Sequence, residues 1–167
     1  LNAAGGSGHN VSVGKSSNDE ITVAVVEILN ATQIADWSWN EDLTDPTTSG
    51  DVVTTGPALL VAVWWGDGNT AIGAHTATPN NDFEIIDSLT TGGIALIQCI
   101  VAVKQVGAGT HNVTWDATNA QGAQLWLFAF QGENNVVSVT LQDAIAAAAG
   151  AVAVAGSAAQ TAADATL

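Results

Sequence analysis

Hydrophobic residues in the middle of the chain fall into three runs separated by glycine-containing turn segments. The runs extend over residues 57–65, 94–103 and 124–130. Each is rich in the β-branched and aromatic residues that suit a pleated, packed surface. The pattern predicts three β-strands, and the block from Pro57 to Gln131 is the most informative part of the chain.

Shorter segments on both sides of this block also have the pattern of strands. Residues 10–13, 21–29 and 34–39 are apolar or alternate with period two, and residues 136–141 form a last candidate strand. The connections are too short for crossover helices, which predicts antiparallel pairing. We therefore expect an all-β fold, an antiparallel β-sandwich of jelly-roll or immunoglobulin-like type with extended N- and C-terminal arms.

Two details of the central block give sharper expectations. Residues 66–70 have the composition of a tight turn. The alternation in residues 110–116 places Val113 and Trp115 on one face of a strand.

The chain divides into three parts by composition. Residues 1–18 are small and polar and are expected to form a flexible arm, and residues 19–141 form the sandwich domain. Residues 142–167 are dominated by alanine and are expected to form an extended or partly helical arm that docks on its own domain or on a neighbouring subunit. The chain starts at Leu1 and contains no Met, so we expect further sequence upstream of Leu1 in the translation product.

Composition and charge exclude several classes of protein. The 167 residues are 47% hydrophobic and 11% charged, which is typical of one folded domain and not of a disordered chain. Sixteen acidic residues face only Lys15 and Lys104, for a net charge of −14. Binding to nucleic acid or to an anionic membrane surface needs clustered cations, so we predict neither partner. The apolar tract at residues 144–156 is too short for a transmembrane helix.

The acidic segment at residues 40–51 is a candidate cation site. Hard cations such as Ca²⁺ take oxygen ligands from carboxylates and amides, although the spacing here is not that of an EF-hand. The alternative is a solvated acidic loop that keeps the protein soluble. The candidate metal ligands are Asn40, Glu41, Asp42, Asp45 and Asp51.

Tryptophan residues are the candidate contact residues. Trp37 and Trp39 share one face of a strand, whereas the adjacent Trp64 and Trp65 point to opposite faces. Exposed rings at these four positions would serve as a subunit contact or stack on glycans, and the alternative is packing in the core. The single Cys99 cannot form an intrachain disulfide and is expected to be a small buried hydrophobe.

No group of residues forms a recognisable catalytic site. Asp82 and Glu84 are close in sequence but lie beside a turn, and the three histidines are spread over an arm and two turns, where we expect them to be solvated. We therefore predict that the protein is not an enzyme.

Four motifs carry a resemblance to a known family: LLVAVWWGDGNT, GGIALIQCIVAV, GAGTHNVTWD and AQLWLFAFQG, which all lie between Pro57 and Gly132. In these motifs the chain resembles a β-sandwich domain family of phage structural proteins and bacterial surface proteins. The resemblance covers just under half of the chain. It implies a decoration, fibre or surface-adhesion module, and it transfers no catalytic residues.

These observations lead to two functional expectations. The first is a non-enzymatic structural protein that assembles in many copies, with itself or with other structural subunits, as a virion component such as a capsid decoration or a head or tail fibre, or as an extracellular surface filament. The alternative is a secreted carbohydrate-binding or adhesive module for surface glycans, with Ca²⁺ as its cofactor if the acidic segment holds an ion. Both place the protein in a virion or outside the cell.

Overall fold

The computed structural model describes residues 10–14, 21–42, 48–69, 77–90, 95–116, 122–132, 138–147 and 152–155. These residues form thirteen β-strands and no helix, and every strand pair among them is antiparallel. The described part of the chain therefore contains no helix of the length and hydropathy needed to cross a bilayer. The strands are β1 (Asn10–Val13), β2 (Ile21–Leu29), β3 (Gln33–Asp42), β4 (Val52–Thr54), β5 (Ala58–Asn69), β6 (Thr78–Pro79), β7 (Glu84–Thr90), β8 (Ala95–Val106), β9 (Gly109–His111), β10 (Trp115–Asp116), β11 (Gly122–Gln131), β12 (Ser138–Ala147) and β13 (Val152–Ala155).

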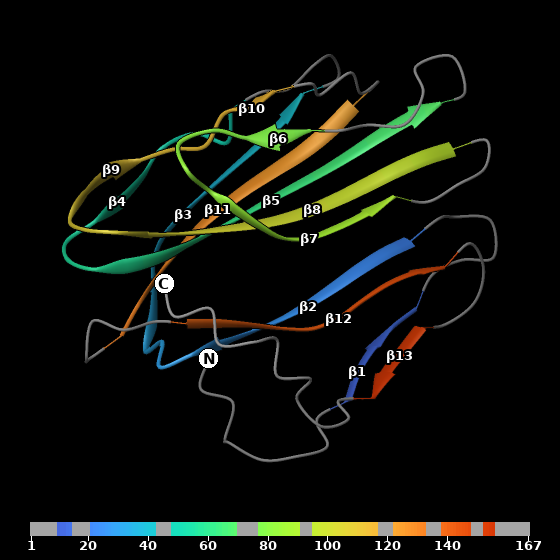
Figure 1. Ribbon diagram of the computed structural model, residues 1–167, viewed down its shortest axis with the longest axis horizontal. Coiled ribbons are helices and arrows are strands. Elements are labelled where there is room, and N and C mark those ends of the chain that lie inside the picture. Colours follow the sequence, from blue (N-terminus) through green and yellow to red (C-terminus); the bar gives the residue numbers. More distant parts are fainter. Residues whose placement is uncertain are drawn as a thin grey trace.

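A five-stranded antiparallel sheet with the order β3-β11-β5-β8-β7 organises the molecule (Figure 1). Its three central strands are the three hydrophobic runs of the sequence, which confirms that prediction. β5 pairs with β8 over twelve residues, from Ala58 opposite Val106 to Asn69 opposite Ala95. The sheet is therefore built on its longest and most apolar strands.

One face of this sheet carries the larger part of the core. The even-numbered residues of β5, among them Leu60 and Trp64, pack with Ile100 and with the segments that contain β4 and β10. Val113 and Trp115 lie in this cluster and are fully buried, so the prediction that they share one face is confirmed. The short strand pairs β4–β9 and β6–β10 lie on this side of the sheet, where β4 and β10 contribute Val52 and Trp115 to the core.

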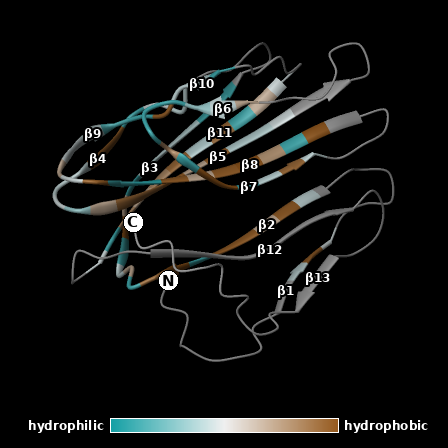
Figure 2. Ribbon diagram, in the orientation of Figure 1, coloured by the Kyte–Doolittle hydropathy of each residue, from teal (hydrophilic) through white to brown (hydrophobic). Residues whose placement is uncertain are grey.

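The opposite face is covered by the two-stranded pair β2–β12. Its register runs from Leu29 opposite Ser138 to Ile21 opposite Ala147, with a bulge after Leu141. Apolar residues of β2, including Val26, pack against the odd-numbered residues of β5 and β8. Figure 2 shows the hydrophobic residues along β2 and along β8. β5 is consequently buried on both of its faces.

Two sequence predictions are wrong in their boundaries. The strand after residue 136 does not stop at 141, since β12 continues to Ala147. Alanine has a high helix propensity, but in this segment the pairing with β2 prevails over it. The alanine-rich tail also contributes β13, which pairs with β1 in a separate ribbon.

The second wrong prediction is the tight turn at residues 66–70, because β5 runs straight through to Asn69. Gly66 serves a different purpose, which is to make room for the ring of Trp64. A Cβ atom built on Gly66 would lie 1.8 Å from Cη2 of Trp64. The glycine is therefore a packing requirement of the buried indole.

This packing gives a test of the core. Replacing Gly66 by Ala forces the buried Trp64 ring out of its position, and overpacking of this kind costs about 1–3 kcal/mol of unfolding free energy. Gly107→Ala is the matched control, because nothing lies within 4 Å of a Cβ at Gly107, and it should change the stability by less than about 0.5 kcal/mol. Urea denaturation of both variants measures the difference, and equal midpoints would contradict this account of Gly66.

Candidate functional site

The β2–β12 pair packs on the part of the five-stranded sheet formed by β5 and β8. On the same face of the sheet, strands β3 and β11 carry a group of more exposed apolar residues. We call this surface the aromatic face. It consists of Ile34, Trp37 and Trp39 of β3 and Trp126, Phe128 and Phe130 of β11. Trp37 is 61% exposed, Trp39 50% and Ile34 48%, while the three residues of β11 are half-buried.

Hydrogen bonds on the other side of β3 fix which residues face outward. The Asp36 carboxylate accepts the backbone N–H of Val53 at 2.7 Å, and the Asn40 side chain donates to the carbonyl of Thr48 at 2.8 Å. The side chains of Asp36 and Asn40 are thus held by the segment that contains β4. Because side chains alternate along a strand, Trp37 and Trp39 point away from that segment.

The register of β3 and β11 arranges four aromatic rings in a two-by-two array. Trp39 lies opposite Trp126, and Trp37 lies opposite Phe128. Phe130 continues the row on β11, with its ring centroid 6.3 Å from that of Phe128. Directly opposite residues on one face of an antiparallel pair have Cβ atoms about 5 Å apart, so the rings form one continuous surface.

A polar pair borders this array. Gln124 lies opposite Glu41 in the register of β11 and β3, one row beyond Trp39 and Trp126, and its amide donates to the Glu41 carboxylate at 3.2 Å. An amide and a carboxylate at the edge of an apolar surface can orient a ligand that carries hydroxyl or amide groups.

The four tryptophan residues predicted to make contacts differ in their exposure. Trp37 and Trp39 share an exposed face, as their spacing indicates. Trp64 is fully buried in the core, so it is not available at the surface, whereas Trp65 is half-buried and lies opposite Gln124. Trp126 was not predicted as a contact residue. The alternation in β11 could have placed it and Phe128 on one face, but no local pattern reveals that β3 is the neighbouring strand.

The structure places the predicted metal ligands apart where it describes them. The side chain of Asn40 faces the β4 segment, and Glu41 points to the opposite side of β3, toward Gln124. Asp51 accepts a hydrogen bond from Asn112 at 2.9 Å. Asp45 and the side chain of Asp42 lie outside the described residues. Within the described part of the chain, no three acidic, His or Cys residues are grouped as a metal site would require.

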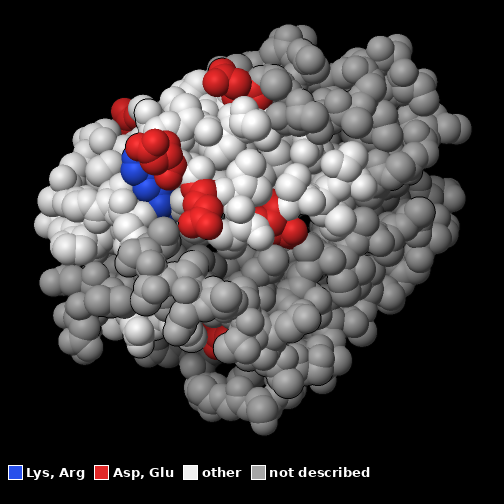
Figure 3. Space-filling model, viewed as in Figure 1, with Lys and Arg blue, Asp and Glu red and all other residues white. Residues whose placement is uncertain are grey.

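The acidic residues in the described part of the chain are spread over the surface. Figure 3 shows them as separate groups on the face in view. Lys104 is the only Lys or Arg among the described residues, since Lys15 lies outside them. The aromatic face, as far as the structure describes it, therefore has no cation and has one carboxylate, that of Glu41, at its border.

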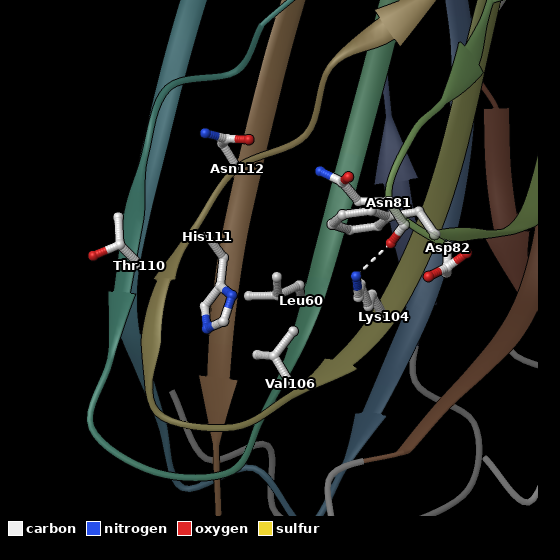
Figure 4. A pocket seen from close by; sticks show the side chains of 9 residues that line it. Leu60, Asn81, Asp82, Lys104, Val106, Thr110, His111 and Asn112 are labelled. Atoms are coloured by element: carbon white, nitrogen blue, oxygen red, sulfur yellow. Dashed lines mark hydrogen bonds between the residues drawn. The ribbon is translucent and has the colours of Figure 1, made fainter.

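A hollow of about 220 Å³ lies on the other side of the sheet and contains Lys104 (Figure 4). The Lys104 ammonium donates to the carbonyl of Asn81 and lies 5.8 Å from the centroid of the Phe83 ring. Asn81 and Asp82 both have left-handed backbone conformations, with φ of 55° and 56°, and lead the chain into β7. The Lys104 ammonium thus contacts the turn at Asn81 and Asp82 and the ring of Phe83, which follows this turn.

His111 lines the same hollow and is not a freely solvated turn residue, which corrects that expectation. It is half-buried, and its Nε2 lies 3.1 Å from the Thr54 hydroxyl and 3.1 Å from the carbonyl of Gly107. The Thr54 hydroxyl also donates to that carbonyl, at 2.7 Å. The three groups fasten the β8–β9 turn to β4. His9 and His75 lie outside the described residues.

Cys99 lies on β8, between Trp65 of β5 and Leu89 of β7 in the sheet register. Burial raises the pKa of its thiol to about 11, the nearby Asp87 carboxylate adds to the increase, and the Thr22 hydroxyl acts in the opposite direction. Burial also raises the pKa of Asp87, against a hydrogen bond from the backbone of Ser88. The thiol is therefore protonated and weakly nucleophilic near neutral pH.

Comparisons of the chain with protein-family models, with curated protein sequences and with solved structures give no match.

The environment of Cys99 predicts a pH-dependent stability. The thiol has a pKa of about 11 in the folded protein against 9.0 for an unperturbed thiol, so between these values the unfolded chain loses its proton first. Stability therefore falls as the pH rises through this window, by about 2 kcal/mol near pH ~10.5. Cys99→Ala lacks this contribution. The difference in unfolding free energy between wild type and variant, measured in urea at several pH values from about 8 to about 10.5, should change by that amount. A constant difference would show that the thiol is not buried as described.

Proposed function

We propose that this chain is a non-enzymatic structural protein that assembles in many copies, as a virion component such as a capsid decoration or a fibre, or as an extracellular surface filament. Its fold would be a β-sandwich, with the five-stranded sheet and the β2–β12 pair as its two layers. The burial of β5 on both faces and the packing of β2 on β8 support this architecture. The four sequence motifs between Pro57 and Gly132 that resemble sandwich domains of phage and bacterial surface proteins would fit the same role.

The observation that carries this proposal is the terminal ribbon, formed by β1 and β13. The two strands pair over four residues, from Asn10 opposite Ala155 to Val13 opposite Val152. In Figure 1 the ribbon lies beyond the β2–β12 pair, away from the five-stranded sheet. Its main contact with the other described strands is that of β13 with β12.

A ribbon of this kind needs a packing partner. An isolated two-stranded hairpin is at best marginally stable in water, and three or more strands or a covering surface are needed to hold one. Four of the eight residues in the ribbon are valine and two are alanine. A neighbouring subunit would supply the missing surface, and strand addition to an existing ribbon is a common way to form such a contact.

The net charge of −14 sets the conditions for assembly. Copies of so acidic a chain repel one another, and the repulsion is screened over about 8 Å at physiological ionic strength and over about 3 Å in molar salt. Assembly should therefore strengthen as salt or divalent cation is added.

Truncation tests the role of the terminal ribbon. Removing residues 148–167 deletes β13 but retains all of β12, which the core requires as the partner of β2. We expect the full chain to form large particles in high salt, and the truncated chain to lose them while it keeps its folded domain by circular dichroism and thermal melting. Light scattering and electron microscopy measure the particles.

A shorter truncation serves as the control. Removing only residues 156–167 leaves β13 in place, so assembly should be unchanged. Removing residues 1–14 deletes β1 and should have the same effect as the loss of β13. Unchanged particle mass after the loss of either ribbon strand would refute assembly through the ribbon.

A further inference from the structure

The aromatic face is a second surface, separate from the terminal ribbon, and it is too apolar to be an ordinary solvated surface. Trp37 and Trp39 alone present on the order of 250 Å² of ring surface, from exposures of 61% and 50%. With Ile34 and the half-buried rings of β11, the contiguous apolar area is about 500 Å², near the upper end for the largest patch on a monomeric protein. Patches of this size are often functional.

The area argues against a second copy of the chain as the occupant. A stable protein–protein interface buries about 800 Å² on each partner, and the aromatic face offers substantially less. A second copy would also bring a further net charge of −14 close to this one. The occupant that fits is smaller, flat and not anionic.

The chemistry of the face favours a sugar chain. One side of a pyranose ring presents C–H groups that pack on an aromatic ring, and two rows of rings on one face of a sheet can receive consecutive sugar units. The Gln124 amide and the Glu41 carboxylate, paired at 3.2 Å beside Trp39, offer a donor and an acceptor for the hydroxyl groups. With no described cation at the face, an anionic polysaccharide lacks a counter-charge there.

We propose that the aromatic face binds a neutral polysaccharide, with Trp37, Trp39, Trp126 and Phe128 as the stacking platform and with Gln124 and Glu41 as the groups that orient the sugar. This activity goes beyond assembly. It would attach the assembled protein to a glycan-bearing surface.

The test uses the full chain and a panel of neutral hexasaccharides of β-linked glucose, N-acetylglucosamine, xylose and mannose, with a heparin fragment as the anionic member. Titration calorimetry and tryptophan fluorescence measure binding. At least one neutral sugar should bind, and its affinity should change less than about twofold between about 0.15 M and about 1 M NaCl, because no charge is neutralised. Heparin should not bind.

Variants locate the site. Trp37→Ala and Trp39→Ala should each weaken binding at least about tenfold, the loss of one stacked ring, and the double variant should not bind. Both side chains are at least half exposed, so the variants should melt within a few degrees of wild type. Val53→Ser is the control, since Val53 is 54% exposed but lies outside the aromatic face.

Three results would overturn the proposal: no neutral hexasaccharide binds at millimolar concentration, the double tryptophan variant binds as wild type does, or the variant converts a wild-type dimer into a monomer in light scattering without any effect of sugar. The last result would identify a second copy of the chain as the occupant. None of these outcomes bears on the truncations that test the terminal ribbon.

Discussion

The structure depends on the burial of β5 on both of its faces. Leu59 and Leu60, neighbours on this strand, point to opposite sides of the sheet and are both fully buried, so each side needs its own cover. Strands lie about 4.8 Å apart, so a sheet of five strands is about two and a half times as wide as the two strands of the β2–β12 pair. That pair lies over the buried residues of β5 and β8. The columns of β3 and β11 lie to one side of that pair, where Trp37 and Trp39 are exposed and Trp126 and Phe128 are half-buried, and the aromatic face is the result.

Tryptophan placement follows from the same constraint. In β5 the even side chains enter the larger core, where Trp64 lies over Gly66. The odd side chains face the β2–β12 side, so Trp65 is half-buried there. Trp64 and Trp65 are neighbours in sequence, but Trp64 packs in the core and Trp65 lies beside the aromatic face. Trp37 and Trp39 are exposed over half or more of their surface, so packing in the core does not account for their placement.

The central strands could be predicted from the sequence because β-branched and aromatic residues are concentrated at residues 57–65, 94–103 and 124–130. The aromatic face could be predicted only in part. Period two placed Trp37 and Trp39 on one side of a strand, but the pairing of β3 with β11 joins positions as far apart as Glu41 and Gln124, 83 residues along the chain. Such long-range registers depend on tertiary packing. For the same reason the alanine-rich end of β12 could not be recognised as a strand, since its partner β2 decides its conformation.

The net charge of −14 limits which partners can bind to the aromatic face or the terminal ribbon. Lys104 is the only Lys or Arg in the described part of this acidic chain, and its ammonium is engaged by the Asn81 carbonyl and the Phe83 ring on the opposite side of the sheet from the aromatic face. That cation is therefore not available at the aromatic face. At the aromatic face, whose described residues include no cation, contacts rely on apolar area, ring stacking and hydrogen bonds, which salt does not weaken. High ionic strength would therefore favour the contact between copies at the terminal ribbon, by screening the repulsion between acidic chains, and would leave the binding of a neutral sugar at the aromatic face nearly unchanged.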